Sequence, residues 1–220
     1  MTCSAQASKR VTDVSDWPEL TFLEELRIGI WSHGIGEHVV VPLGRPATDE
    51  DLWLTKFKAE IVDGQMVVIG PTTLGPADAA ANIRKSLDDY ERSTRGGYQT
   101  GAVAFIVDLP HRRSFCPDVG WYTGDPYASE FLLGAPAFAV EIRDPGEEGD
   151  EAERRMAAKR ADYFAAGTQV VWDVDVLREN LIRAYRANDP GHPTVYRGGE
   201  TADAEPAVPG WRFPVDELFD

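Results

Sequence analysis

Three runs rich in Val, Ile and Phe occupy the centre of the chain and most constrain its fold. They are YQTGAVAFIVDLP at residues 98–110, SFCPDVGWYTG at residues 114–124 and APAFAVEIRDP at residues 135–145. Such runs are typical of β-strands, and strands close in sequence usually neighbour each other, so we expect the three to lie in one sheet. Helical patterns on both sides predict an α/β (α+β) domain in which helices flank a mixed β-sheet.

Two helices follow from the spacing of apolar residues. Residues 76–92 carry apolar side chains three or four positions apart, and Gly96-Gly97 is expected to end that helix. Residues 150–166 form the second predicted helix, closed by Gly167. These helices bracket the three strand-like runs.

Turn residues and apolar runs predict the remaining elements. Asp63-Gly64 joins two short runs and indicates a hairpin. Strands are expected at residues 168–176 and 179–186, and the tail from residue 205 is expected to pack back on the core.

The N-terminal part is predicted to differ from the rest. Residues 1–15 are polar and aperiodic, whereas the stretch after Pro18 has helical spacing, and a Pro- and acid-rich break follows at residues 43–51. We therefore expect an N-terminal leader and helix over residues 1–50 and one main domain over residues 51–220.

Charge restricts the partners. The chain has 22 Lys+Arg and 37 Asp+Glu, a formal net charge of −15, which repels polyanions unless basic residues cluster locally. The sequence contains neither a membrane-spanning apolar stretch nor a signal-peptide core, so we expect a cytoplasmic protein with reduced Cys3 and Cys116.

Two acidic residues, Asp118 and Glu141, lie at positions that are unusual for acidic residues in β-strands. Asp118 follows Pro117 at the start of a strand, and taken alone it is most simply a turn aspartate. Glu141 interrupts the apolar run AFAVEI, where an unpaired charge would cost several kcal/mol, so it needs a cation. That cation is either an arginine, such as Arg143, or a metal. If the two carboxylates project from adjacent strands they can converge on Mg²⁺.

Lys159 supplies a third polar group. It lies on the apolar face of the second helix, in line with Ala152, Met156 and Tyr163. A structural lysine that reaches to the surface would explain it in isolation. Aimed at two carboxylates, it could instead orient an attacking water or stabilise charge on a phosphate.

The ordered series of segments resembles the Uma family of putative restriction endonucleases, within the PD-(D/E)xK nuclease superfamily. The series is AEIVDGQMVVIGP, SFCPDVGWYTG, AFAVEIRDP, KRADYFAAG, VVWDVDV and PGWRFPVDELF, and it extends from about Lys58 to Phe219. The resemblance implies a mixed sheet flanked by helices, with carboxylates where central strands diverge. It also implies hydrolysis of DNA phosphodiester bonds with Mg²⁺, or Mn²⁺ as the alternative ion.

The resemblance also implies roles for particular residues. Asp118 and Glu141 match the metal-binding positions, and Lys159 and Tyr163 match the family's K-x-x-x-Y-x-x-x-G arrangement. Glu60 matches an auxiliary carboxylate, for which an exposed hairpin glutamate is an equally good interpretation. Arg143 stands where the superfamily lysine normally does. The basic residues nearest the site in sequence, expected to contact phosphate, are Arg143, Arg154, Arg155, Lys159 and Arg160.

The chain departs from the family pattern near the proposed site. It has EIRDP where a serine is frequent, and the loop DPGEEGDEAE carries six acidic residues that would repel a DNA backbone. Two hypotheses therefore remain: a Mg²⁺-dependent endonuclease acting on DNA, or a catalytically weak or inactive nuclease-fold protein that serves as an interaction module, with a homodimer as one form.

Overall fold

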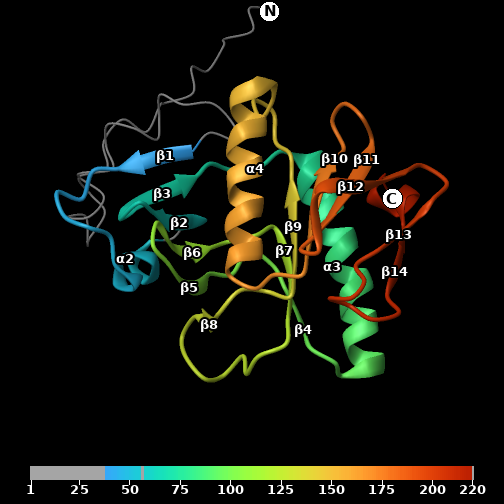
Figure 1. Cartoon of the computed structure of the whole chain (residues 1–220), viewed down its shortest axis with the longest axis horizontal. Coiled ribbons are helices and arrows are strands. Elements are labelled where there is room, and N and C mark those ends of the chain that lie inside the picture. The colour runs from blue at the N-terminus through green and yellow to red at the C-terminus, as the bar shows by residue number, and fades with distance from the viewer. Residues whose placement is uncertain (1–37, 56, 220) are drawn as a thin grey trace, which may run out of the picture.

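The computed structural model describes residues 38–55 and 57–219. In this part of the chain the strands form two six-stranded sheets and one two-stranded ribbon. Two long helices, α3 (Leu74–Thr94) and α4 (Gly149–Ala165), lie on opposite sides of the second sheet (Figure 1). The predicted helix after Pro18 lies outside the described residues, and the division of the chain at residue 50 stays a prediction.

The first sheet contains the predicted hairpin. Its strands β2 and β3 are joined by Asp63, at a φ of 51°, and Gly64, at a φ of 71°, the left-handed conformations that a type I′ turn requires. The sheet order is β1-β3-β2-β6-β5-β8. Its strands are β1 (His38–Val41), β2 (Ala59–Val62), β3 (Gln65–Ile69), β5 (Phe105–Leu109), β6 (Arg112–Phe115) and β8 (Leu132–Leu133).

The second sheet carries the most deeply buried strands. Its order is β12-β11-β10-β9-β7-β4, and β9 and β10 run parallel, joined through α4. Every residue of β7, β9 and β10 is buried, as expected for strands covered on both faces. The strands are β4 (Tyr98–Thr100), β7 (Val119–Tyr122), β9 (Phe138–Ile142), β10 (Val170–Asp175), β11 (Leu181–Arg186) and β12 (Asp189–Arg197).

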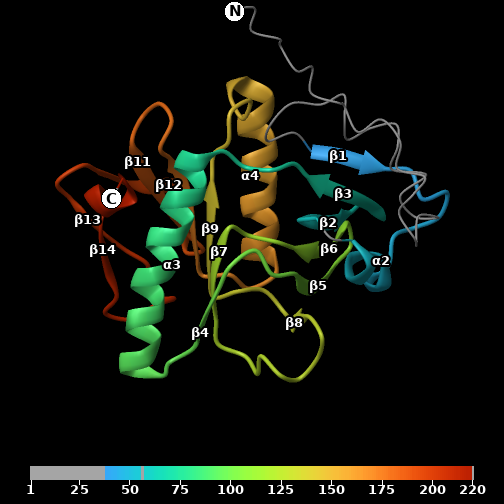
Figure 2. The same cartoon turned by 180° about the vertical axis from the view of Figure 1, so that it is seen from behind.

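Alternation along β9 decides which side chains face which helix. Phe138, Val140 and Ile142 belong to the core that α3 covers, whereas Ala139 faces α4 and the first sheet. Glu141 shares the face of Ala139 and therefore points toward α4, where it meets Lys159. Figure 2 shows β9 between α3 and α4. The strand thus carries an apolar side and a side that reaches a polar cluster.

The expectation that the three central runs share one sheet is confirmed in part. Each run contributes one strand to the second sheet, where β4, β7 and β9 are neighbours, but two of the runs also contribute a strand to the first sheet. The run at 114–124 divides at Pro117, so β6 belongs to the first sheet and β7 to the second. Proline lacks an N–H for a strand ladder, which makes it a natural point for the chain to leave one sheet and enter the other. The run at 98–110 also divides, into β4 in the second sheet and β5 in the first.

The helix ends differ in their chemistry. α4 ends as predicted, because Gly167 has a φ of 105° and the N–H groups of Gly167 and Thr168 donate to the carbonyls of Phe164 and Tyr163, a Schellman arrangement. α3 ends instead at Arg95, which adopts the left-handed conformation with a φ of 55° that we expected of the following glycines.

Smaller elements complete the described chain. The tail packs on the core as predicted, with Trp211, Phe213 and Leu218 buried. Part of the expected break at residues 43–51 forms the start of a helix. The elements are α2 (Asp49–Leu54), β13 (Thr201–Asp203), β14 (Arg212–Pro214) and the 3-10 helix η2 (Val215–Phe219). None of the helices in the described ranges has the length and apolar character needed to cross a membrane.

Candidate active site

A narrow cavity of about 30 Å³ is lined by residues of both sheets and of α4. It has room for one or two water-sized groups. Three of the residues predicted from the sequence, Asp118, Glu141 and Lys159, line it together. The full lining is His38, Lys58, Ile69, Asp118, Glu141, Ile142, Asp144, Glu147, Met156 and Lys159.

Asp118 is held rigidly against β9. Its backbone N–H donates to Val140 O at 3.0 Å, and its Oδ2 accepts from the Ile142 N–H at 2.8 Å. Its Oδ1 lies 2.6 Å from Lys58 Nζ. The residue after Pro117 is therefore fixed by backbone contacts to the neighbouring strand and by one ammonium group.

Glu141 is buried and receives two donors on one oxygen. Tyr163 OH donates to its Oε1 at 2.6 Å, and Lys159 Nζ lies 2.9 Å from the same atom. Burial raises the pKa of Glu141, against the nearby ammonium groups of Lys159 and Lys58. Oε2 makes no hydrogen bond within the described residues, so it is available to a ligand. The cation that Glu141 requires is Lys159, and Arg143 does not contact it.

Lys159 bridges two carboxylates that come from different sheets. Its Nζ lies 2.8 Å from Glu60 Oε1 on β2 and 2.9 Å from Glu141 Oε1 on β9. The side chain of Lys159 is one-tenth exposed, so this lysine does not reach out to solvent. Although burial opposes it, Glu141 and Glu60 raise the pKa of Lys159. The ammonium group is therefore a charged link between the two sheets.

Glu60 is an interior residue, not an exposed hairpin glutamate. It is 5% exposed, and its Oε1 also accepts from the Cys116 N–H at 3.0 Å. Its Oε2 lies 2.6 Å from Arg112 Nη1. Against the effect of burial, Lys159 and Arg112 lower the pKa of Glu60 to about 2. The two cations therefore favour the ionised form of this carboxylate beside the cavity.

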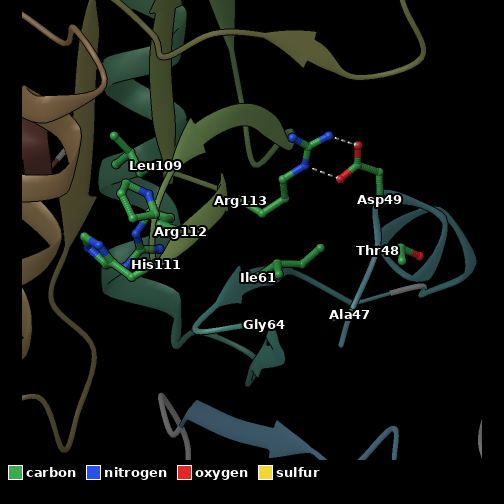
Figure 3. Close-up of a pocket in the computed structure, with 10 residues that line it drawn as sticks. Ala47, Thr48, Asp49, Ile61, Gly64, Leu109, His111, Arg112 and Arg113 are labelled. Carbon is green, nitrogen blue, oxygen red and sulfur yellow. Dashed lines mark hydrogen bonds and ion pairs between the residues drawn. The ribbon is translucent and has the colours of Figure 1, made fainter. Parts of the chain in front are cut away.

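The polar cluster continues through Arg112 to the protein surface. Arg112 Nε donates to Asp162 Oδ2 at 2.7 Å, and Asp162 Oδ1 lies 2.6 Å from His111 Nε2. His111 and Arg112 also line a larger pocket of about 370 Å³ (Figure 3). Ile61 lines that pocket while its neighbour Glu60 faces α4, so the pocket lies across β2 from the narrow cavity.

Arg143 does not line the cavity. Its Nε and Nη2 donate to the two oxygens of Asp173 at 2.7 and 2.8 Å, and its Nη1 pairs with Glu153. Arg160 also pairs with Asp173, at 3.2 Å. The guanidinium groups of Arg143 and Arg160 therefore bind carboxylates of the chain itself. Arg155, which was also expected to contact phosphate, pairs with Glu151 on the surface of α4.

Several cavity residues were missed in the sequence. Lys58 directly precedes β2, two residues before Glu60, and no local pattern distinguishes it. His38 lies on β1 and lines the cavity, 3.8 Å from Glu147. Asp144 and Glu147 come from the acidic loop, and Glu147 Oε2 accepts from the Asp144 N–H at 3.0 Å. The loop therefore folds into the cavity wall.

The donor set suits a hard cation held by few protein ligands. Within the described ranges no group of three or more His, Cys, Asp and Glu residues is arranged to hold a metal by itself. Asp118 and Glu141 nevertheless line one small space, and Glu141 Oε2 is unused. Mg²⁺ commonly takes one or two carboxylates and completes its shell with water and substrate oxygens, so the two residues fit such an ion.

Comparisons with known proteins agree with this architecture. A family model named Uma2, described as "Putative restriction endonuclease", matches residues 50–216. A crystal structure of a putative nuclease belonging to DUF820 from Anabaena variabilis superposes with a TM-score of 0.63 at 17% identity, covering 79% of this chain and 98% of that one. That likeness shows the fold. No curated protein matched the chain.

Proposed function

The chain belongs to the Uma2 family of putative restriction endonucleases, and from that premise we propose that it is a divalent-cation-dependent endonuclease that hydrolyses DNA phosphodiester bonds. The observation that carries the proposal is the shared cavity of Asp118 and Glu141, with Lys159 bonded to Glu141. Mg²⁺ is the proposed ion, with Mn²⁺ as the alternative.

Asp118 and Glu141 are the proposed cation ligands. A bound divalent cation would polarise the scissile phosphate and make an attacking water more acidic. Tyr163 and Lys159 hold Glu141 Oε1, which directs the remaining oxygen of that carboxylate to the ligand. The Ile142 N–H donates to Asp118 Oδ2 and thereby orients that carboxylate.

Lys159 is the proposed charged side chain that contacts the attacking water or the phosphate. An ammonium group has three N–H donors, and Glu60 and Glu141 accept two of those of Lys159. The third makes no hydrogen bond within the described residues and can donate to the attacking water or to a phosphate oxygen. Glu60 keeps the ammonium in place, which makes Glu60 a positioning residue.

Charge in the cavity supports a cation requirement for DNA binding. Its lining has four carboxylates, Asp118, Glu141, Asp144 and Glu147, and two lysines, Lys58 and Lys159. The formal charge of this lining is therefore −2, from four negative and two positive groups, which one divalent cation neutralises. A phosphodiester approaches a neutral site far more readily than an anionic one.

A plasmid-nicking assay tests the proposal. Purified protein with Mg²⁺ or Mn²⁺ is expected to nick supercoiled DNA, and Glu141→Gln and Asp118→Asn should each lower the rate by about a hundredfold or more, since a cation ligand contributes several kcal/mol. Glu151→Gln is the matched control, because Glu151 is an exposed glutamate on α4. Nicking that survives in the Glu141 and Asp118 variants would exclude this site.

The acidic lining favours one alternative, a nuclease-fold protein that binds without cleaving. In that case gel-shift titrations would show cation-dependent DNA binding with no nicked product, and sedimentation would report whether the chain forms a homodimer. Binding that is lost in Asp118→Asn, without cleavage by the parent protein, would support this alternative over the enzyme.

A further inference from the structure

Lys58 is a charged cavity residue to which the proposed chemistry assigns no role. It comes from the first sheet, directly before β2, where its carbonyl accepts from the Ile69 N–H at 2.8 Å. Its side chain crosses to the second sheet and places Nζ 2.6 Å from Asp118 Oδ1. The side chains of Lys58 and Asp118 are 19% and 25% exposed, so the pair lies at the partly closed mouth of the cavity.

The cavity provides one ammonium group for each proposed cation ligand. Lys58 pairs with Asp118, and Lys159 pairs with Glu141. Lys159 has a second carboxylate, Glu60, that holds it in place. Lys58 has Asp118 as its sole ion-pair partner within the described residues, so its position depends on that one carboxylate.

A divalent cation and the Lys58 ammonium cannot share Asp118 without cost. Such a cation binds a carboxylate oxygen at about 2.0–2.1 Å. The ammonium is already 2.6 Å from Oδ1, and the other oxygen accepts from the Ile142 N–H. In a cavity of about 30 Å³ the two positive charges would repel strongly.

We propose that Lys58 is an internal counter-ion that occupies the place of the divalent cation on Asp118 and must leave this carboxylate when the cation binds. The inference rests on the proposed function for its cation site and adds a regulatory property to it. Lys58 neutralises Asp118 in the cation-free protein and thereby weakens cation binding.

Cation titrations of the full chain without DNA test the inference. Mn²⁺ affinity, measured by calorimetry or by the electron paramagnetic resonance signal of free Mn²⁺, is expected to rise about tenfold in Lys58→Met, which corresponds to ~1.4 kcal/mol. Lys85→Met is the matched control, because Lys85 is an exposed lysine on α3 and its loss changes net charge equally. The gain should disappear in Lys58→Met combined with Asp118→Asn.

A second variant should change the Mn²⁺ affinity in the opposite direction, and it keeps the positive charge at residue 58. Lys58→Arg keeps the cation and can bind Asp118 through two N–H groups, so its Mn²⁺ affinity should fall below that of the parent protein. Thermal unfolding adds a further readout. Without Mn²⁺, Lys58→Met should melt at a lower temperature than the parent protein, and Mn²⁺ should raise its melting temperature by more.

Two results would overturn the inference, and each is separable from failure of the proposed function. The first is that Lys58→Met binds Mn²⁺ no more tightly than the parent protein, while Asp118→Asn still loses binding. That result would show that Lys58 does not compete with the cation, and the proposed cation site would stand. Absence of Mn²⁺ binding in both the parent protein and Lys58→Met also overturns the inference, and the nicking assay then decides the enzyme proposal independently.

Discussion

Lys159 Nζ on α4 lies 2.9 Å from Glu141 Oε1 on β9. Both residues are buried, with side chains 10% and 9% exposed, so the contact is an ion pair inside the protein. A buried pair with well-placed hydrogen bonds contributes little net stability compared with apolar residues, but breaking it is costly because one charge remains without a partner. The position of Lys159 among apolar helix residues is thereby explained by the carboxylates it meets.

Lys159→Met is expected to destabilise the protein by about 3 kcal/mol or more. Methionine preserves the length and helix preference of the side chain, so the loss comes from leaving Glu141 without its ammonium partner. Urea unfolding followed by circular dichroism measures the change. Adding Glu141→Gln to Lys159→Met should recover part of the loss, and a double-mutant cycle that shows no coupling would contradict the contact.

Tyr163→Phe isolates the second donor to Glu141. The ring of Tyr163 stacks on the ring of Phe115, with the two ring centroids 4.0 Å apart, and phenylalanine retains that packing. We expect a loss of about 1.5–3 kcal/mol, the range for a hydrogen bond to a charged group. Tyr127→Phe is the matched control, since that tyrosine is 88% exposed. Equal urea midpoints for the two variants would show that the bond to Glu141 contributes nothing.

Local sequence patterns predicted the elements whose determinants are themselves local. The helix at 150–166 and the hairpin at Asp63-Gly64 are confirmed, because helical periodicity and turn chemistry act within a few residues. The division of the central runs between two sheets depends on pairing with distant strands, which periodicity does not encode. β12 was missed because Pro190, Gly191 and Pro193 lie within it, and these residues are typical of turns.

The site could be predicted where a polar residue stands in an apolar pattern. Glu141 and Lys159 were recognisable because each interrupts a buried face, and the structure brings them together with Asp118. Lys58 gave no such signal, since it lies at the start of a strand and its partner is 60 residues away. The sequence placed Arg143 near the site because it lies two residues after Glu141. In the structure Arg143 instead pairs with Asp173 on the next strand, β10. The metal-binding roles stay predictions.

Arg143→Met is expected to destabilise the protein by about 3 kcal/mol, because it leaves the fully buried Asp173 with Arg160 as its remaining arginine partner. Arg155→Met is the control, since the Arg155 pair with Glu151 is exposed and such pairs contribute about 0.3–0.5 kcal/mol. Urea unfolding compares the two. Similar small losses would show that the Arg143 pair behaves as a surface pair.

Gly97→Ala tests the close approach of β4 to β7. A Cβ at Gly97 would lie 2.7 Å from Tyr122 O and from the Trp121 ring, so the backbone or a buried tryptophan must shift. We expect a loss of about 3 kcal/mol, at the upper end for overpacking. At Gly191 a Cβ meets no atom within 4 Å, and Gly191→Ala should change stability by less than about 0.5 kcal/mol. Equal melting temperatures would contradict the packing.

Asp51 gives a pH-dependent prediction at the start of α2. Its oxygens lie 2.7 and 2.8 Å from the guanidinium of Arg45, and the Thr48 N–H donates to Oδ2 at 2.8 Å. The hydrogen bonds from Arg45 are the main cause that lowers the pKa of Asp51 from 3.8 to about 2. A carboxyl whose pKa is lower in the folded state stabilises the protein above its unfolded pKa and loses that contribution as pH falls.

Asp51→Asn should therefore cost about 1–2 kcal/mol at pH 6, a value reduced for solvent screening because the side chain of Arg45 is 54% exposed. The stability difference between the parent protein and Asp51→Asn should narrow between pH 3.8 and about 2, where the folded carboxylate of Asp51 takes up its proton. Unfolding free energies of both proteins at several pH values measure this difference. The contributions of the other acidic groups cancel in it, because both proteins carry those groups. Asp78→Asn, at an exposed position of α3, is the control. A difference that stays constant down to pH 2 would show that Arg45 does not hold the Asp51 charge.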